Sequence, residues 1–236
     1  MSVTLAALVA PIKGVAFDLD GTLLDTLPDI AGAGNAMLAD LGREAVSESV
    51  VRSYIGDGIP TLAKRLLTLS RDGEPDRGLF DQALASFQAH YFAGLNRQTR
   101  AFPGVVEGLH VLRDARIPLA CVTNKAERFT RPLLEAHGMS AFFEVVLGGD
   151  SLPRKKPDPL PLLHCCRAFR LRPEELLLVG DSLVDVRAAK AAGCVAACVP
   201  YGYTGGRDVR DLGADAIVPG VLELARAIVL AHPLPA

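Results

Sequence analysis

Short apolar runs alternate with helical patterns from about residue 100 to the end of the chain. The runs are too short for helices, and residues between them recur at helical spacing, as do Val105, Val106, Leu109 and Leu112. The expected strands are 15–17, 117–122, 143–147, 176–179, 194–199 and 215–218. This alternation predicts an α/β fold: a doubly wound, mostly parallel, Rossmann-like sheet with helices on both faces. Ligands of such a sheet bind at the carboxyl ends of its strands.

Between residues 26 and 99 the pattern changes to helices only. Four amphipathic faces follow one another: Ile30, Met37, Leu38 and Leu41; Val50, Val51 and Tyr54; Leu62, Leu66 and Leu67; and Phe80, Ala83, Leu84, Phe87, Tyr91 and Leu95. Ser47 is placed to cap the second helix. We therefore expect a core formed by residues 1–25 and 100–236, with a helical-bundle cap inserted at residues 26–99.

Composition narrows the class of function. Half of the 236 residues are hydrophobic, which predicts a large core, and the net charge of −2 indicates neither a nucleic-acid partner nor an anionic membrane surface. No apolar run approaches the ~20 residues of a membrane span. Residues 1–10 precede the first lysine, Lys13, so we expect a frayed terminus and not a signal peptide. The sequence does not distinguish a monomer from a homodimer, and both stay open.

The cysteines indicate a reducing environment. There are five, an odd number, and they form no CxxC pair: Cys121, Cys165, Cys166, Cys194 and Cys198. Most lie in apolar stretches, where a small buried thiol is the ordinary interpretation. We therefore expect a cytoplasmic protein without a disulfide framework.

Two aspartates mark the end of the first expected strand. In the segment FDLDGT, Asp18 and Asp20 are two residues apart, so their side chains point the same way while the chain is extended. Gly21 then allows the backbone to turn. A turn capped by aspartate is the ordinary explanation for one Asp-Gly pair. It does not explain a second aspartate together with three further polar segments.

Those segments are Thr123-Asn124, Lys155-Lys156-Pro157 and Gly180-Asp181-Ser182-Leu183-Val184-Asp185. Each has an ordinary alternative: a helix N-cap for the first, a solvated surface pair for the lysines, and a helix cap for Asp181 and Ser182. Each segment also lies at or just beyond the end of an expected strand, and a parallel sheet gathers such ends at one edge. The conjunction of the four segments therefore indicates a site.

The four segments in this order resemble the haloacid dehalogenase-like hydrolase superfamily, over nearly the whole chain. Within it, residues 18–26 (DLDGTLLDT), Thr123-Asn124-Lys125, residues 155–159 (KKPDP) and Tyr201-Gly202-Tyr203 are similar to the bacterial phosphoglycolate phosphatases. The inserted helices are similar to that family's small cap. The resemblance implies Mg²⁺-dependent hydrolysis of a small phosphorylated metabolite, 2-phosphoglycolate, to glycolate and phosphate.

The resemblance also implies roles for the motif residues. Asp18 would be the nucleophile, forming an aspartyl-phosphate that divides a very slow hydrolysis into two steps. Asp20 would protonate the leaving alkoxide and then take a proton from water. Thr123, the Asn124 backbone and Lys156 would bind the phosphoryl group. Lys156 is chosen because it directly precedes Pro157; Lys155 is expected to be a surface charge.

Such a site needs a cation, because four aspartates would surround a dianionic substrate. Two unit charges 4 Å apart repel by ~4 kcal/mol at an effective dielectric near 20. Mg²⁺ suits an all-oxygen site. The resemblance implies Asp18, the backbone carbonyl of Asp20, and Asp181 as its ligands. Asp185 is expected to orient a bound water or to support Lys156.

The cap is expected to set specificity and to exclude water by closing. The Gly56-Asp57-Gly58 segment could be a lid element or a plain helix–helix turn. A two-carbon phosphorylated acid needs a cation for its carboxylate, and Lys64 and Arg65 are the candidates; a solvated helix face is the alternative for either. The family usually has Asn where this chain has Asp57, and a carboxylate facing an anionic substrate is unfavourable.

Several other functions share part of this pattern. A phosphosugar mutase has the same scaffold and would pass the phosphoryl group to a second hydroxyl, and phosphatases of other small metabolites also use it. A dehalogenase has no leaving alkoxide for Asp20 to protonate. A receiver-like phospho-aspartate switch combines acidic residues, Mg²⁺, a threonine and a lysine on a parallel sheet. It needs neither an inserted lid nor an acid two residues after the phosphorylated aspartate.

Overall fold

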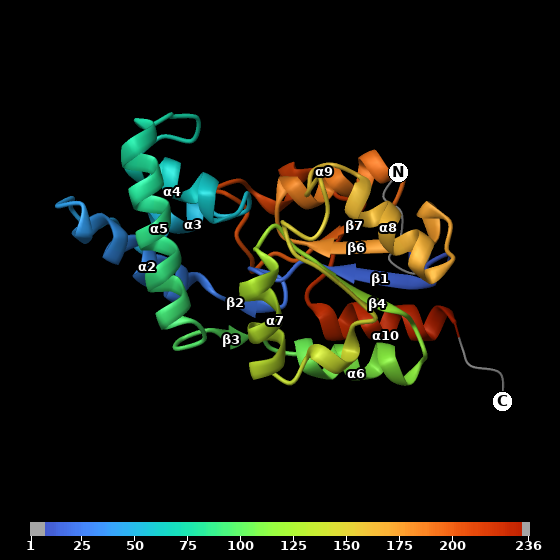
Figure 1. Ribbon diagram of the computed structural model, residues 1–236. Coiled ribbons are helices and arrows are strands. Elements are labelled where there is room, and N and C mark those ends of the chain that lie inside the picture. Colours follow the sequence, from blue (N-terminus) through green and yellow to red (C-terminus); the bar gives the residue numbers. More distant parts are fainter. Residues whose placement is uncertain (1–7, 233–236) are drawn as a thin grey trace.

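The computed structural model describes residues 8–232, so residues 1–7 of the expected frayed terminus lie outside it. Its central sheet has the strand order β5-β4-β1-β6-β7-β8, and every pairing in it is parallel (Figure 1). The strands are β1 (Gly14–Phe17), β4 (Leu119–Val122), β5 (Val145–Leu147), β6 (Leu176–Gly180), β7 (Val195–Cys198) and β8 (Ala216–Ile217). All six expected strands are present, and the predicted doubly wound sheet is confirmed.

Helices cover both faces of this sheet (Figure 1). Helices α6 (Val105–Asp114), α7 (Glu127–Ala136) and α10 (Val221–Ala231) lie on one face, and α8 (Leu160–Phe169) and α9 (Leu183–Ala192) on the other. Three 3₁₀ helices, Ser140–Phe142, Pro173–Glu175 and Val209–Leu212, complete the core. Val15 and Phe17 pack on the first face and Ala16 on the second. The strands are apolar throughout because both faces are buried.

Strand β1 lies between β4 and β6, the point at which the strand order reverses direction. The chain runs from β1 through the helical insertion to β4 on one side, and later reaches β6 on the other. In open α/β sheets ligands bind in the crevice at such a reversal. The carboxyl ends of β1, β4 and β6 are therefore the expected place for a site.

Four helices form a separate bundle beside the sheet, at the left of Figure 1. They are α2 (Leu27–Asp40), α3 (Glu48–Tyr54), α4 (Ile59–Thr68) and α5 (Arg77–Gly94). Each predicted amphipathic face contributes to one buried cluster, for example through Ile30, Val51, Leu66 and Phe87. We refer to this bundle as the cap.

A short antiparallel pair, β2 (Leu24–Asp25) with β3 (Arg100–Ala101), joins the cap to the core. The sequence did not predict it, because two-residue strands show no periodicity. Next to it, the Asp29 carboxylate accepts hydrogen bonds from the backbone N–H groups of Gln98 (2.9 Å) and Thr99 (3.0 Å). The two crossings between core and cap are thereby tied together.

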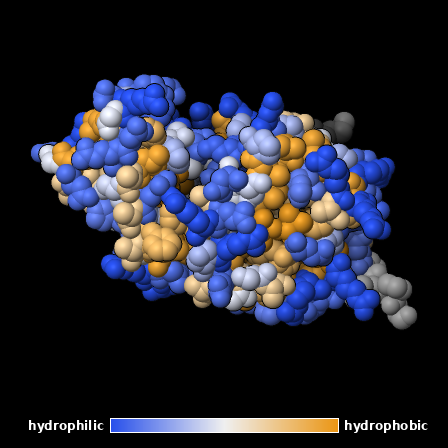
Figure 2. Space-filling model, in the orientation of Figure 1, coloured by the Kyte–Doolittle hydropathy of each residue, from blue (hydrophilic) through white to orange (hydrophobic). Residues whose placement is uncertain are grey.

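Two aromatic residues of the core belong to the buried cluster of the cap, Phe129 and Tyr203. The Phe129 ring meets that of Tyr91 with centroids 5.1 Å apart. The Tyr203 hydroxyl donates to Asp25 (2.6 Å) and accepts from the N–H groups of Thr26 and Leu27. In the space-filling view the cap and the core form two lobes whose visible face is largely hydrophilic, with hydrophobic areas between polar ones (Figure 2).

Within residues 8–232, no helix has the length and apolar character needed to cross a membrane. All five cysteines are buried and free. The Sγ atoms of Cys166 and Cys194 lie 3.9 Å apart and form a thiol–thiol hydrogen bond, not a disulfide.

Candidate active site

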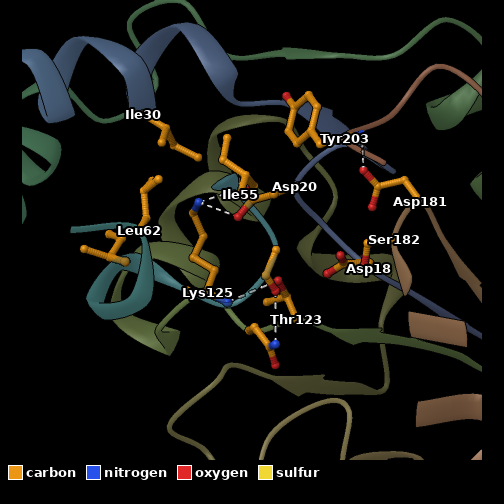
Figure 3. Close-up of a pocket in the computed structure, with 14 residues that line it drawn as sticks. Asp18, Asp20, Ile30, Ile55, Leu62, Thr123, Lys125, Asp181, Ser182 and Tyr203 are labelled. Carbon is orange, nitrogen blue, oxygen red and sulfur yellow. Dashed lines mark hydrogen bonds and ion pairs between the residues drawn. The ribbon is translucent and has the colours of Figure 1, made fainter. Parts of the chain in front are cut away.

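A cavity lies between the carboxyl edge of the sheet and the cap (Figure 3). From the core it is lined by Asp18, Asp20, Thr123, Asn124, Lys125, Asp181, Ser182 and Tyr203, and from the cap by Ile30, Ile55, Gly56, Gly58, Ile59 and Leu62. Residues from three of the four predicted segments therefore meet in one place. The fourth segment contributes Lys156, which is not among the lining residues but contacts Asp18 directly.

Lys156 is buried between two carboxylates. Its Nζ lies 3.0 Å from Asp18 and 2.6 Å from Asp185, and its side chain is only 2% exposed. Burial alone would lower the pKa of Lys156, but the two carboxylates raise it above its ordinary value. This excludes the solvated-pair interpretation of Lys156. One of the two roles expected for Asp185, support of Lys156, matches this contact.

Ser182 and Asp185 also begin helix α9. Ser182 occupies the N-cap position. The Asp185 carboxylate accepts hydrogen bonds from the backbone N–H of Ser182 (3.1 Å) and from the Ser182 hydroxyl (2.6 Å). The helix-cap alternative, which was given for Asp181 and Ser182, is therefore correct for Ser182, and this cap operates alongside the contact of Asp185 with Lys156. Asp181 is placed differently: its carboxylate accepts from the backbone N–H of Tyr203 and lies 3.4 Å from the hydroxyl of Thr22.

Two glycines allow this position of Asp181. A Cβ added to Gly21 or to Gly202 would overlap the Asp181 side chain. Gly21 also has a φ of +84°, a conformation that favours glycine. The Asp-Gly turn after β1 thus brings the backbone against Asp181 from one side, and the Tyr-Gly-Tyr segment does so from the other.

The donor set fits a divalent cation. Asp18, Asp181 and Asp185 are buried, and one carboxylate oxygen of each lies within 4.8 Å of the others. The ammonium group of Lys156 contacts two of these carboxylates, those of Asp18 and Asp185. Burial raises the pKa of Asp18 to about 6 and that of Asp181 well above its ordinary value. Asp185 does not line the cavity, and both of its oxygens accept hydrogen bonds from Lys156 or Ser182. Asp18 and Asp181, which do line it, are the side chains that would hold Mg²⁺, which prefers oxygen ligands of this kind.

Asp20 is held by a residue to which the sequence interpretation assigned no role. Lys125 Nζ lies 2.8 Å from each carboxylate oxygen of Asp20, and the Thr26 hydroxyl donates to one of them at 2.7 Å. The Lys125 side chain is 2% exposed, and its pKa is raised by Asp20 although burial opposes this. Lys125 directly follows Thr123-Asn124 after β4, and this position is the signal that could have identified it.

Thr123 and Asn124 lie where β4 ends, but they do not cap the following helix, because Ala126 occupies the N-cap position of α7. The Asn124 side chain instead bridges core and cap. Its Nδ2 donates to the carbonyls of Lys156 (2.9 Å) and Gly56 (3.1 Å). The helix-cap alternative for this segment is therefore wrong.

The prediction that Lys155 is a surface charge is also wrong. Lys155 is half-buried, and its Nζ donates to the carbonyl of Asp57 at 2.5 Å. Burial lowers the pKa of Lys155. The cap segment Gly56-Asp57-Gly58 therefore contacts this lysine, and no local sequence pattern predicts such a contact between distant segments.

Neither Lys64 nor Arg65 is among the described residues that line the cavity. Lys64 Nζ pairs with Glu74 at 2.6 Å on the surface of the cap. Arg65 is buried and donates to the carbonyls of Tyr54 (2.7 Å) and Arg71 (3.1 Å), and it pairs with Asp57 at 2.7 Å. The carboxylate of Asp57 therefore faces a guanidinium within the cap, which accounts for an acidic residue at this position.

These contacts predict that Arg65 stabilises the cap. Arg65→Met leaves two carbonyls without their donor, so we expect a fall in the free energy of unfolding on the order of 2–3 kcal/mol in urea denaturation. Lys64→Met, which removes an exposed ion pair on the same helix, is the matched control and should change it by less than about 1 kcal/mol. Equal stability of Arg65→Met and the unchanged protein would contradict this role.

Comparisons with known proteins identify the family of this chain. The family model described as haloacid dehalogenase-like hydrolase matches residues 15–199. A phosphoglycolate phosphatase of Thiobacillus denitrificans is 54% identical over 91% of this chain and 95% of its own length. Another, of Nitrosospira multiformis, is 54% identical over 92% of this chain and 96% of its own.

A crystal structure described as a predicted phosphoglycolate phosphatase from Haemophilus somnus superposes with a TM-score of 0.86. It is 34% identical and covers 92% of this chain and 97% of its own. The family model spans the sheet edge with all four polar segments, and the relatives span nearly the whole chain. The chain belongs to the haloacid dehalogenase-like hydrolases.

Proposed function

We propose that this hydrolase is a Mg²⁺-dependent phosphatase that converts 2-phosphoglycolate to glycolate and phosphate through an aspartyl-phosphate. The observation that carries the proposal is the buried contact of Lys156 with Asp18, beside Asp181 and at the end of a cavity that the cap covers. Carboxylates that line a cavity, with a buried cation in contact with one of them, suit a phosphoryl group. The names of the two bacterial relatives support the choice of 2-phosphoglycolate.

Asp18 is the proposed nucleophile. One of its carboxylate oxygens attacks phosphorus, and the bond from phosphorus to the glycolate oxygen breaks. Lys156, 3.0 Å from Asp18, lies where it would offset the negative charge of the transferring group. Thr123, buried at the end of β4, would donate its hydroxyl to an oxygen of that group. Mg²⁺, held by Asp18 and Asp181, would supply the remaining positive charge.

Asp20 is the proposed acid and base. It lies in the same cavity, two residues after Asp18, and would give its proton to the leaving glycolate oxygen. In the second half-reaction Asp20 takes a proton from the water that attacks the aspartyl-phosphate, releasing phosphate and restoring Asp18. The apolar cap residues Ile30, Ile55 and Leu62 cover the cavity and would keep other water away.

Phosphate release from a panel of esters tests this function. The panel contains 2-phosphoglycolate, glycerol phosphate, a hexose 6-phosphate and a hexose 1-phosphate, each with Mg²⁺. We expect the highest kcat/KM for 2-phosphoglycolate. Better turnover of the neutral sugar phosphates would contradict the proposed substrate, and an isomerised hexose phosphate in place of free phosphate would indicate a mutase.

Removal of divalent cations gives a second prediction. Without a divalent cation, the three buried carboxylates have the single positive charge of Lys156 near them. A dianionic ester is therefore repelled by the negative charge that remains. We expect chelation to reduce phosphate release by at least about 100-fold, the scale of several kcal/mol of charge stabilisation. Added Mg²⁺ should restore it. Unchanged release in excess chelator would contradict a divalent cofactor.

A further inference from the structure

The cavity contains little positive charge away from its phosphate end. Among the described residues that line it, Lys125 is the only one with a cationic side chain. The cap supplies apolar groups, among them Ile55 and Leu62. Figure 3 shows the amine of Lys125 directed at Asp20, in the cavity that these apolar groups also line. A substrate bound through its phosphate at Asp18 would direct its other end toward this region.

Lys125 is buried where the core meets the cap. Its Nζ lies 4.8 Å from the centroid of the Tyr91 ring, which belongs to cap helix α5. The Tyr91 hydroxyl is buried without a hydrogen-bond partner among the residues that the structure describes. Lys125 and Asp20 therefore form a nearly desolvated pair, 2% and 15% exposed, in contact with both lobes. An ammonium in such a place interacts strongly with any carboxylate that reaches it.

The present partner of Lys125 is itself a carboxylate. Both oxygens of Asp20 accept from Lys125, and one also accepts from Thr26. Asp20 held in this way is not free to turn toward a leaving oxygen. A substrate that brought its own carboxylate could take the place of Asp20 on Lys125, because it offers the ammonium the same pair of oxygen acceptors, while the Thr26 hydroxyl continues to donate to Asp20.

We propose that Lys125 recognises the carboxylate of the substrate and releases Asp20 in the same exchange. This inference rests on the proposed phosphatase function and deepens it, because it assigns the site to short phosphorylated acids. An acidic substrate pairs with Lys125 and frees Asp20 for proton transfer. A neutral ester leaves Lys125 on Asp20 and should therefore react slowly even when it is bound.

The test compares two esters of equal chain length. One is 2-phosphoglycolate, and the other is 2-hydroxyethyl phosphate, in which a hydroxymethyl group replaces the carboxylate. For the unchanged protein we expect kcat/KM to favour the acid by about 10- to 100-fold, the scale of one charge-assisted hydrogen bond. Part of the difference should lie in kcat, since only the acid releases Asp20.

Substitutions of Lys125 should change this preference. Lys125→Met is expected to reduce the ratio of the two kcat/KM values to about one, because the acid loses its partner while the neutral ester never had it. Lys125→Arg keeps the charge and should retain most of the preference. Lys155→Met is the matched control, since Lys155 is a half-buried lysine that also contacts the cap but lies outside the described lining of the cavity, and it should leave the ratio unchanged.

The possible results test the role of Lys125 separately from the proposed phosphatase function. A purely structural role for Lys125 would lower the kcat/KM of both esters equally, so a preserved preference in Lys125→Met would overturn the inference. The unchanged protein also tests it without any variant: equal turnover of the two esters would overturn the inference and leave the phosphatase function standing. Failure to hydrolyse any ester in the presence of Mg²⁺ would contradict the proposed function, and the inference with it.

Discussion

Replacement of Asp18 by asparagine is expected to reduce phosphate release by on the order of 10⁴- to 10⁶-fold, the loss typical of an enzyme deprived of its nucleophile. The amide has nearly the same shape as the carboxylate but lacks the charged oxygen that attacks phosphorus. Steady-state release from 2-phosphoglycolate with Mg²⁺ measures the effect. Because Lys156 keeps its contact with Asp185, the variant should remain folded.

A matched substitution separates this loss from a general effect of removing a carboxylate. Asp114, at the end of α6, is 67% exposed and pairs with the neighbouring Arg113, away from the cavity. Asp114→Asn should therefore retain full turnover. Substantial turnover by Asp18→Asn, with the protein shown to be pure and folded, would contradict the nucleophilic role.

Removal of the ammonium of Lys156 should weaken the fold as well as the reaction. In Lys156→Met the carboxylates of Asp18 and Asp185 lose the buried cation between them. Removing one partner of a buried ion pair commonly costs about 3–5 kcal/mol. We expect a fall of that size in the free energy of unfolding, measured by urea denaturation without Mg²⁺, together with loss of phosphate release.

Two further variants show whether uncompensated charge is the cause. Lys155→Met removes the adjacent lysine, which contacts a carbonyl rather than a carboxylate, and should lower the free energy of unfolding by about 1 kcal/mol or less. Adding Asp185→Asn to Lys156→Met removes one of the two buried carboxylates that have lost their cation, and it should recover part of the lost stability. Lys156→Met as stable as the unchanged protein would contradict this explanation.

The core was predictable because its strands are buried on both faces. Segments such as 176–179 are apolar at every position, which distinguishes them from the amphipathic helices that follow. Gly193 ends helix α9 in a left-handed conformation with φ +73°, which is common for a glycine after the last turn of a helix. The short pair β2–β3 was not predictable, since two residues have no period and only the return of the chain at Arg100 creates their pairing.

The site was predictable where its residues follow strand ends. Asp18, Thr123 and Asp181 come directly after β1, β4 and β6, so the parallel sheet alone brings them to one edge. The residues that were missed depend on contacts between lobes. The position of Lys125 after Thr123-Asn124 placed it at the same edge, but its contacts with Asp20 and Tyr91 became evident only in the folded structure, as did the contact of Lys155 with the Asp57 segment.

The helix that carries Lys64 and Arg65 shows the same limit. Its sequence offers two neighbouring cations, and nothing in the spacing says which carboxylate each will meet. Folding of the cap pairs Lys64 with Glu74 and Arg65 with Asp57, both within the cap. The cation left at the cavity comes from the core, on the segment after β4.

Rapid quenching of the reaction with radiolabelled substrate tests the transfer of phosphate to Asp18 most directly. 2-Phosphoglycolate labelled in its phosphate would be mixed with the protein and Mg²⁺, quenched in acid within one turnover, and the protein digested. The predicted result is a hydroxylamine-sensitive label on the peptide that contains Asp18, absent from Asp18→Asn. Single-turnover release of phosphate with no labelled protein at any time, or a label on another residue, would contradict it.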